Sequence, residues 1–255
     1  MIFTIDIGNT ETVLGIFDGE ELAAHWRLST HHERTADEYG ILLRSLLRES
    51  QIQCNALEGA VIASVVPPLT HALEDACARY LDLPPLLVEP GADLPIRLAV
   101  EEPLSVGADR IANTLAAAHL YRMDTIVVDL GTATTFDCIA ADGTFLGGII
   151  APGIRTGAET LTRRTAKLPR VDIEPPRSVI GRRTDTALQS GIFYGAVDAI
   201  DGMVRRIQEE WTAQTRTVAT GGLARLLAPH CRTIDHVEPF LTLHGLRIAW
   251  VESRA

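Results

Sequence analysis

The chain has 255 residues, 46% of them hydrophobic, which is enough apolar material for one large or two medium domains. Its net charge of −10 argues against broad binding to nucleic acid or to membrane surfaces, and no apolar run approaches the roughly 18 residues of a membrane span. Four scattered cysteines without a Cys-x-x-Cys motif, and an N-terminus that starts directly with a strand-like run, predict a cytoplasmic protein with reduced thiols.

Lys167 is the only lysine in the sequence, and it does not lie in a Gly-rich loop. The sequence therefore excludes a Walker A phosphate loop and the strand lysine of protein kinases. If the protein handles ATP, then Mg²⁺, backbone N–H groups and arginine side chains must neutralise the phosphates.

The first predicted element is a β-hairpin, in which two strand-like runs flank residues 6–10. Gly8 and Asn9 tolerate positive φ angles, so this turn is expected to point backbone N–H groups into a concavity that binds phosphate. Asp6, at the end of the first strand, would repel a bare phosphate. Its presence predicts a Mg²⁺ ion between carboxylate and phosphate.

Further elements of the first half follow from hydrophobic patterning. Residues 22–28 predict a third strand, and Thr35 and Glu38 form a capping box that opens an amphipathic helix. Residues 59–66 predict a buried strand that two prolines end, and residues 70–81 predict another helix. The adjacent His31 and His32 lack ligand-like spacing, and a solvated turn is the favoured interpretation.

The stretch Gly107-Ala108-Asp109-Arg110 opens a helix that runs to about residue 120. Asp109 has two possible roles. An acidic residue in a first helical turn interacts favourably with the helix dipole, which needs no function. Alternatively, Asp109 is a general base, and Arg110 binds an anionic substrate beside it.

The Asp-x-Gly pattern occurs a second time about half a chain later, where Asp129-Leu130-Gly131-Thr132 joins two strand-like runs. A single copy is compatible with an ordinary β-turn, but two matched copies indicate two homologous halves. We therefore predict an α/β fold with two related domains, residues 1–115 and 116–255. The two turns would face each other across an interdomain cleft.

The remaining predictions concern the second half. Residues 147–153 predict a Gly-rich turn into a short helix, and residues 163–183 a basic loop. Thr184 is predicted as the N-cap of a long helix, a position where free N–H groups can also bind an anion. Gly221-Gly222 ends a strand, and it is either a plain strand-to-helix turn or a place where the backbone approaches a nucleoside.

Taken together, these motifs resemble the type III pantothenate kinases of the acetate and sugar kinase/Hsc70/actin superfamily. The resemblance runs nearly end to end, and its most specific block is Gly107-Ala108-Asp109-Arg110. The other matching blocks, in the same order as in the family, are residues 6–10, 37–40, 64–68, 129–132, 147–153 and 184–195.

The resemblance implies ATP-dependent phosphorylation of pantothenate, the first step of coenzyme A biosynthesis, by a homodimer that uses a divalent metal and K⁺ or NH₄⁺. It implies that Asp109 accepts the proton and that Asp129 binds the monovalent cation, which leaves Asp6 for the Mg²⁺ side. The implied substrate-binding residues are Gly107, Ala108, Asp109, Arg110 and Thr184. The implied ATP-binding residues are Asp6, Ile7, Gly8, Asn9, Thr10, Glu11, Thr12, Val13 and Thr132.

Two positions depart from the family pattern. Val100 stands where many members carry tyrosine, and Arg183 stands where a small polar residue is common. Two alternatives to the pantothenate kinase hypothesis remain open: a kinase of the same superfamily for another small hydroxy acid, and a non-catalytic regulatory homologue.

Overall fold

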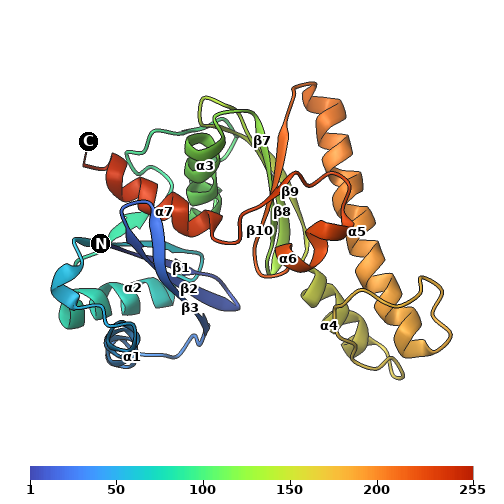
Figure 1. Ribbon diagram of the computed structural model, residues 1–255, viewed down its shortest axis with the longest axis horizontal. Coiled ribbons are helices and arrows are strands. Elements are labelled where there is room, and N and C mark those ends of the chain that lie inside the picture. Colours follow the sequence, from blue (N-terminus) through green and yellow to red (C-terminus); the bar gives the residue numbers. More distant parts are fainter. Residues whose placement is uncertain (255) are drawn as a thin grey trace. The chain divides into compact units, whose positions relative to one another are not determined.

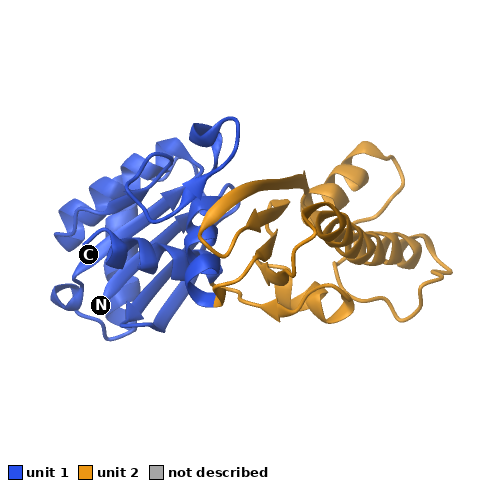
Figure 2. Cartoon of the chain, turned by 90° about the horizontal axis from the view of Figure 1, so that it is seen from above, with its two compact units in different colours: residues 1–120, 241–255 blue, residues 121–240 orange. Residues whose placement is uncertain are grey.

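The computed structural model describes residues 1–254, which form two compact units, shown in two colours in Figure 2. Unit 1 comprises Met1–Leu120 together with the C-terminal segment that begins at Leu241, and unit 2 is Tyr121–Phe240. Each unit has a β-sheet with helices packed on it (Figure 1). Among the described residues, no helix combines the length and apolar character needed to cross a bilayer.

Unit 1 has a sheet of order β3-β2-β1-β4-β5, in which β1 is antiparallel to β2 and parallel to β4. The strands of this sheet are β1 (Ile2–Ile7), β2 (Glu11–Asp18), β3 (Glu21–Ser29), β4 (Gly59–Ser64) and β5 (Leu86–Val88), and the short β6 (Arg97–Leu98) is not part of it. Its helices are α1 (Ala36–Glu49), α2 (Pro67–Ala76), which continues as a π-helical turn (Cys77–Leu81), α3 (Ala108–Tyr121) and α7 (Leu241–Glu252). Short 3₁₀ turns lie at Cys54–Ala56 and Pro103–Ser105.

Unit 2 arranges its strands in the order β11-β10-β7-β8-β9. They are β7 (Thr125–Leu130), β8 (Ala133–Ile139), β9 (Thr144–Pro152), β10 (Arg216–Thr220) and β11 (His236–Val237). The helices are α4 (Ile154–Arg164), α5 (Thr184–Trp211) and α6 (Ala224–Leu227), followed by a 3₁₀ turn at Ala228–His230.

The two sheets share one topology. In each, the first strand lies between an antiparallel hairpin partner and a parallel strand: β1 between β2 and β4, and β7 between β8 and β10. Asp6 and Asp129 occupy the same place, one residue before the end of that first strand. The repeat predicted from the two Asp-x-Gly stretches is therefore confirmed.

The predicted capping box at the start of α1 is confirmed. The Thr35 hydroxyl accepts from the Glu38 N–H at 3.3 Å, and the Glu38 carboxylate accepts from the Thr35 N–H at 2.8 Å. The helix then turns Tyr39, Leu43 and Leu47 inward, as its periodicity predicts. These side chains share a core with residues of β1 and β2, namely Phe3, Ile5, Ile7, Leu14 and Ile16.

The division of the chain differs from the predicted one in its C-terminal part. The last helix, α7, belongs to unit 1 rather than to the second half. Glycines make room for it: a Cβ on Gly245 would lie 1.9 Å from the Ala112 carbonyl oxygen, and one on Gly59 would lie 2.0 Å from the Trp250 ring. Such contacts join residues far apart in sequence, so local patterning does not reveal them.

The Gly-rich turn predicted at residues 147–153 is instead largely strand. β9 continues to Pro152, and Gly148 and Ile150 pair with residues of β8. A register shift in the β8–β9 pairing accompanies Gly147, whose φ of +120° suits glycine. The short helix predicted after this stretch is present as α4.

Candidate functional site

The first phosphate turn, residues 8–10, joins β1 to β2. The Gly8 N–H donates to the Glu11 carbonyl at 3.0 Å, and a Cβ on Gly8 would lie 2.9 Å from that oxygen. Neither Gly8 nor Asn9 has a positive φ angle, so the prediction that this turn needs residues tolerant of positive φ is wrong. Glycine is needed at position 8 because the backbone closes tightly on itself.

Thr30, which follows β3, holds this turn from outside the hairpin. Its N–H donates to the Thr10 carbonyl at 2.9 Å, and its hydroxyl donates to the Gly8 carbonyl at 2.8 Å. The hydroxyls of Thr30 and Thr12 lie 3.1 Å apart. Thr30 was not predicted from the sequence, because no local pattern distinguishes a threonine at the end of a strand.

Asp109 lies in the first turn of α3, as predicted, where the Gly107 carbonyl accepts the Ile111 N–H at 3.1 Å. The Asp109 carboxylate accepts from the Arg110 N–H at 2.8 Å. A Cβ on Gly107 would lie 2.5 Å from Asp109 Oδ1. Glycine at position 107 therefore leaves space for this carboxylate.

Burial raises the pKa of Asp109 above the ordinary value of an aspartate. Three effects oppose it: the hydrogen bond from the Arg110 N–H, the positive charge of Arg110 and a hydrogen bond from the backbone of Asp109 itself. Desolvation is the larger effect, so the carboxylate is a stronger base than its place at a helix N-terminus alone would make it.

Val65 connects the first phosphate turn to the start of α3. Its N–H donates to the Ile7 carbonyl at 3.1 Å, and its side chain lies 3.6 Å from the position of a Cβ on Gly107. Ile7 follows Asp6 directly, and Gly107 precedes Asp109 by two residues. Unit 1 therefore brings the turn and the start of α3 together at one edge of its sheet.

The second phosphate turn joins β7 to β8, and the Gly131 N–H donates to the Ala133 carbonyl at 3.1 Å. Asp129 Oδ1 lies 3.4 Å from where a Cβ on Gly131 would be, and 2.5 Å from one on Gly221. Gly221 has a φ of +87° and directly follows β10. The second phosphate turn and the predicted turn at Gly221-Gly222 thus meet around one carboxylate.

Helix α4 begins against the same turn. A Cβ on Gly153, the N-cap residue, would lie 2.0 Å from the Thr132 carbonyl oxygen, and the Thr156 hydroxyl donates to that oxygen at 2.9 Å. The N-cap glycine makes no side-chain cap bond to the first turn of α4. N–H groups at such a helix start can bind an anion. Thr156, like Thr30, was not identified from the sequence.

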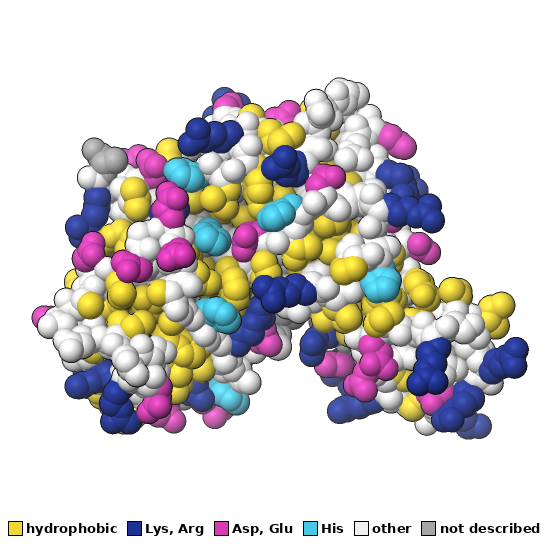
Figure 3. All heavy atoms as spheres, viewed as in Figure 1, with side chains coloured by type: hydrophobic (Ala, Val, Ile, Leu, Met, Phe, Trp, Pro, Cys, Tyr) yellow, Lys and Arg dark blue, Asp and Glu magenta, His cyan; other side chains and the backbone are white. Residues whose placement is uncertain are grey.

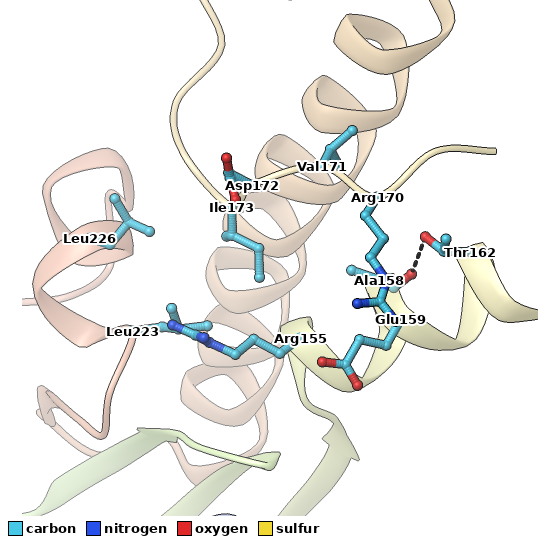
Figure 4. A pocket seen from close by; sticks show the side chains of 10 residues that line it. All are labelled: Arg155, Ala158, Glu159, Thr162, Arg170, Val171, Asp172, Ile173, Leu223 and Leu226. Carbon is cyan, nitrogen blue, oxygen red and sulfur yellow. Dashed lines mark hydrogen bonds between the residues drawn. The ribbon is translucent and has the colours of Figure 1, made fainter. Parts of the chain in front are cut away.

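A pocket of about 450 Å³ lies beside α4 within unit 2 (Figure 4). Arg155 and Glu159 of α4 line one side, and Leu223 and Leu226, which follow Gly221-Gly222, line another. The pocket lies next to the second phosphate turn, because the N–H of its lining residue Leu223 donates to the Leu130 carbonyl at 3.4 Å. The other lining residues are Ala158, Thr162, Arg170, Val171, Asp172 and Ile173.

Thr184 is the first residue of α5 rather than its N-cap, so this prediction is wrong. The N-cap is Arg183, whose N–H donates to the Thr186 hydroxyl at 3.2 Å and whose guanidinium contacts the Asp185 carboxylate at 2.8 Å. The Thr184 side chain is exposed.

Basic side chains concentrate in one part of unit 2. Residues 155–183 contain eight arginine or lysine residues and three acidic ones, in a chain with a net charge of −10. In Figure 3, Lys and Arg side chains gather over α4 and the segment that follows it. Within residues 1–254, no three His, Cys, Asp or Glu side chains form a metal-binding cluster.

A family model, described as type III pantothenate kinase, matches residues 2–206. Solved structures show the fold. A conserved Campylobacter jejuni protein assigned to the Baf family of transcriptional activators has a TM-score of 0.61 at 20% identity, covering 99% of this chain and 98% of the other. The activator of 2-hydroxyisocaproyl-CoA dehydratase from Clostridium difficile, with bound ADPNP, has a TM-score of 0.57 at 11% identity, covering 99% and 96%.

The ROK hexokinase from Thermus thermophilus has a TM-score of 0.54 at 15% identity, covering 99% of each chain. These similarities show the two-part fold of the actin-like ATPases and of acetate and sugar kinases. At such low identities they show the fold alone.

Proposed function

Because the chain belongs to the type III pantothenate kinase family, we propose that it transfers the γ-phosphoryl group of ATP to the hydroxyl of pantothenate, the first step of coenzyme A biosynthesis. The observation that carries this proposal is the meeting of the first phosphate turn with Asp109 at one edge of the unit 1 sheet. Phosphoryl transfer requires a phosphate site and a residue that orients the attacking hydroxyl near each other.

Asp109 orients the pantothenate hydroxyl and accepts its proton as the phosphoryl group is transferred. The raised pKa of this carboxylate suits the role, because a base should hold a proton more tightly than an ordinary aspartate does. Arg110, in the same helical turn, binds the pantothenate carboxylate by a charge-assisted hydrogen bond. Gly107, Ala108 and Thr184 complete the substrate-binding set.

ATP binds through its phosphates at residues 6–13 and at Thr132. Its nucleoside occupies the pocket beside α4, whose Leu223 is hydrogen-bonded to the strand that carries Asp129. Arg155 and Arg170 line this pocket and offer positive charge in a chain with one lysine. Leu223, Leu226 and Ile173 offer apolar contacts to a base.

The family uses ATP with a divalent metal, and the half-buried Asp6 fits that role. Mg²⁺ there would neutralise phosphate charge, bound by one carboxylate and the phosphate oxygens. Asp129 fits K⁺ or NH₄⁺, because Gly131 and Gly221 lack the Cβ atoms that would crowd its Oδ1. The active form is a cytoplasmic homodimer.

The deciding experiment is a coupled assay of pure protein with ATP, Mg²⁺ and pantothenate, with and without K⁺, and Asp109→Asn as the inactive control. Formation of phosphopantothenate that depends on pantothenate and is lost in the variant supports the proposal. If ATP is consumed with another small hydroxy acid instead, the substrate assignment is wrong. Absence of turnover with any acceptor would favour a non-catalytic regulatory homologue.

A further inference from the structure

Each phosphate turn has one carbonyl held by a threonine hydroxyl from outside its own hairpin. In unit 1, Thr30 donates to the Gly8 carbonyl at 2.8 Å, and in unit 2, Thr156 donates to the Thr132 carbonyl at 2.9 Å. Thr30 follows a strand, whereas Thr156 lies in the first turn of α4. The two halves therefore use different elements to make the same contact.

Peptide geometry links these contacts to the phosphate-binding surface. The C=O and N–H of a trans peptide point in opposite directions, and the described chain has no cis peptide bond. Since the Gly8 carbonyl points at Thr30, the Asn9 N–H points away from Thr30. The Thr10 carbonyl accepts the Thr30 N–H, so the Glu11 N–H also points to the side opposite Thr30.

The number of protons available also decides which hydroxyl donates in the contact between Thr12 and Thr30. A hydroxyl has one proton, and Thr30 donates its proton to the Gly8 carbonyl. In the 3.1 Å contact between the two hydroxyls, Thr12 must then be the donor and Thr30 the acceptor. Thr12 is fully buried, so this contact joins the second strand to the residue that holds the turn.

We propose that Thr30 and Thr156 are positioning residues for the nucleotide phosphates. Thr30 orients two peptides of the first turn so that their N–H groups face the ligand. Thr156 fixes the peptide after Thr132, and with it the Thr132 side chain, against the start of α4. The proposal rests on the nucleotide binding of the proposed function, but it needs neither pantothenate nor turnover.

Calorimetric titration with MgADP tests this directly. Thr30→Val and Thr156→Val keep the β-branched shape and remove the hydroxyl, and we expect each to weaken binding about tenfold, as the loss of one hydrogen bond implies. Thr30→Ser and Thr156→Ser keep the hydroxyl and should stay within about threefold of wild type. In steady-state assays, the valine variants should raise the KM for ATP while leaving that for pantothenate nearly unchanged.

Matched controls are Thr70→Val in α2 and Thr165→Val after α4, whose hydroxyls donate to the carbonyls of Val66 and Leu161. Both should bind MgADP like wild type. If Thr30→Val and Thr156→Val also bind like wild type, the inference is overturned and the contacts only support the fold. If a valine variant is unfolded in a melting scan, the alanine variant at that position is titrated against its serine counterpart. Failure of the wild-type protein to bind MgADP would instead overturn the proposed function.

Discussion

The Asp129 carboxylate lies so close to Gly221 that a Cβ on this glycine would be 2.5 Å from Asp129 Oδ1 and 2.8 Å from the Leu130 backbone. Gly221 directly follows β10, and Asp129 lies one residue before the end of the adjacent parallel strand β7, where it pairs with Thr220. The glycine thus gives the carboxylate its space at the edge of the unit 2 sheet.

Gly221→Ala should abolish or strongly weaken MgADP binding and lower the melting temperature. The substitution combines a clash against backbone with a φ of +87°, and strained backbone of this kind costs roughly 1–3 kcal/mol. Gly202→Ala, inside α5 with open space around it, is the control and should stabilise the protein by about 0.5–1 kcal/mol. Normal nucleotide binding by Gly221→Ala would show that the Asp129 carboxylate and the space that Gly221 leaves for it are not part of the nucleotide site.

Asp109→Asn should lower kcat by about 10²–10⁴-fold, because asparagine cannot take the proton. The melting temperature should not fall. The folded state raises the pKa of Asp109, so its contribution to stability is present below the unfolded pKa and is lost as pH rises through the folded pKa. At neutral pH the ionised carboxylate therefore lowers the free energy of unfolding, and asparagine removes this destabilisation.

The same raised pKa predicts the acid limb of the pH–rate profile. Activity should decline with falling pH through a pKa above that of an ordinary aspartate, as Asp109 becomes protonated. Steady-state kcat/KM for pantothenate, measured at saturating ATP across the acid range, gives this value. An acid limb at or below the ordinary aspartate pKa would assign the proton acceptor to another group.

Asp6→Asn and Asp129→Asn should separate the two ions. We expect Asp6→Asn to raise the Mg²⁺ requirement or to abolish turnover at every K⁺ concentration, since Mg²⁺ is bound through one or two carboxylates. Asp129→Asn should mainly shift the K⁺ or NH₄⁺ activation curve. Titration of each ion against each variant measures both effects. An unchanged monovalent-ion dependence in Asp129→Asn would instead indicate two carboxylates that share one divalent metal.

Asp201 stabilises unit 2 through hydrogen bonds to the loop after α6, accepting from the N–H groups of Arg232 at 2.9 Å and Thr233 at 3.0 Å and from the Thr233 hydroxyl at 2.8 Å. Asp201→Ala should lower the free energy of unfolding by about 2 kcal/mol, the range for hydrogen bonds to a charged group. Asp198→Ala, at an exposed position of the same helix, is the control and should have little effect.

The effect of Asp201→Ala should depend on pH. Burial raises the pKa of Asp201, but the hydrogen bonds from Arg232 and Thr233 and the charge of Arg205 together bring it below the ordinary value. The stabilisation is therefore complete above the unfolded pKa and is lost as pH falls through the folded pKa. Denaturant unfolding should show that the difference in free energy of unfolding between the wild type and Asp201→Ala decreases in acid. A difference that stays constant with pH would assign the effect to packing.

The amino-acid sequence by itself determined the local features of this protein. The two Asp-x-Gly hairpins, the Thr35–Glu38 capping box and the Asp109 position at a helix start follow from patterns a few residues long. Hydrogen bonds and side-chain periodicity within one element produce such patterns, so they can be recognised without the fold. The repeat of the Asp-x-Gly stretch also predicted the shared topology of the two sheets.

Only the tertiary structure decided which distant residues complete each site. Thr30 donates a hydrogen bond to the Gly8 carbonyl, and Thr156 donates one to the Thr132 carbonyl. Helix α7 belongs to unit 1, where Gly245 packs closely against Ala112. Burial likewise decided that the pKa of Asp109 rises although its place in a helix favours the charged form. These features depend on distances and on exclusion of water between segments far apart in the chain, and neither is encoded in the spacing of neighbouring residues.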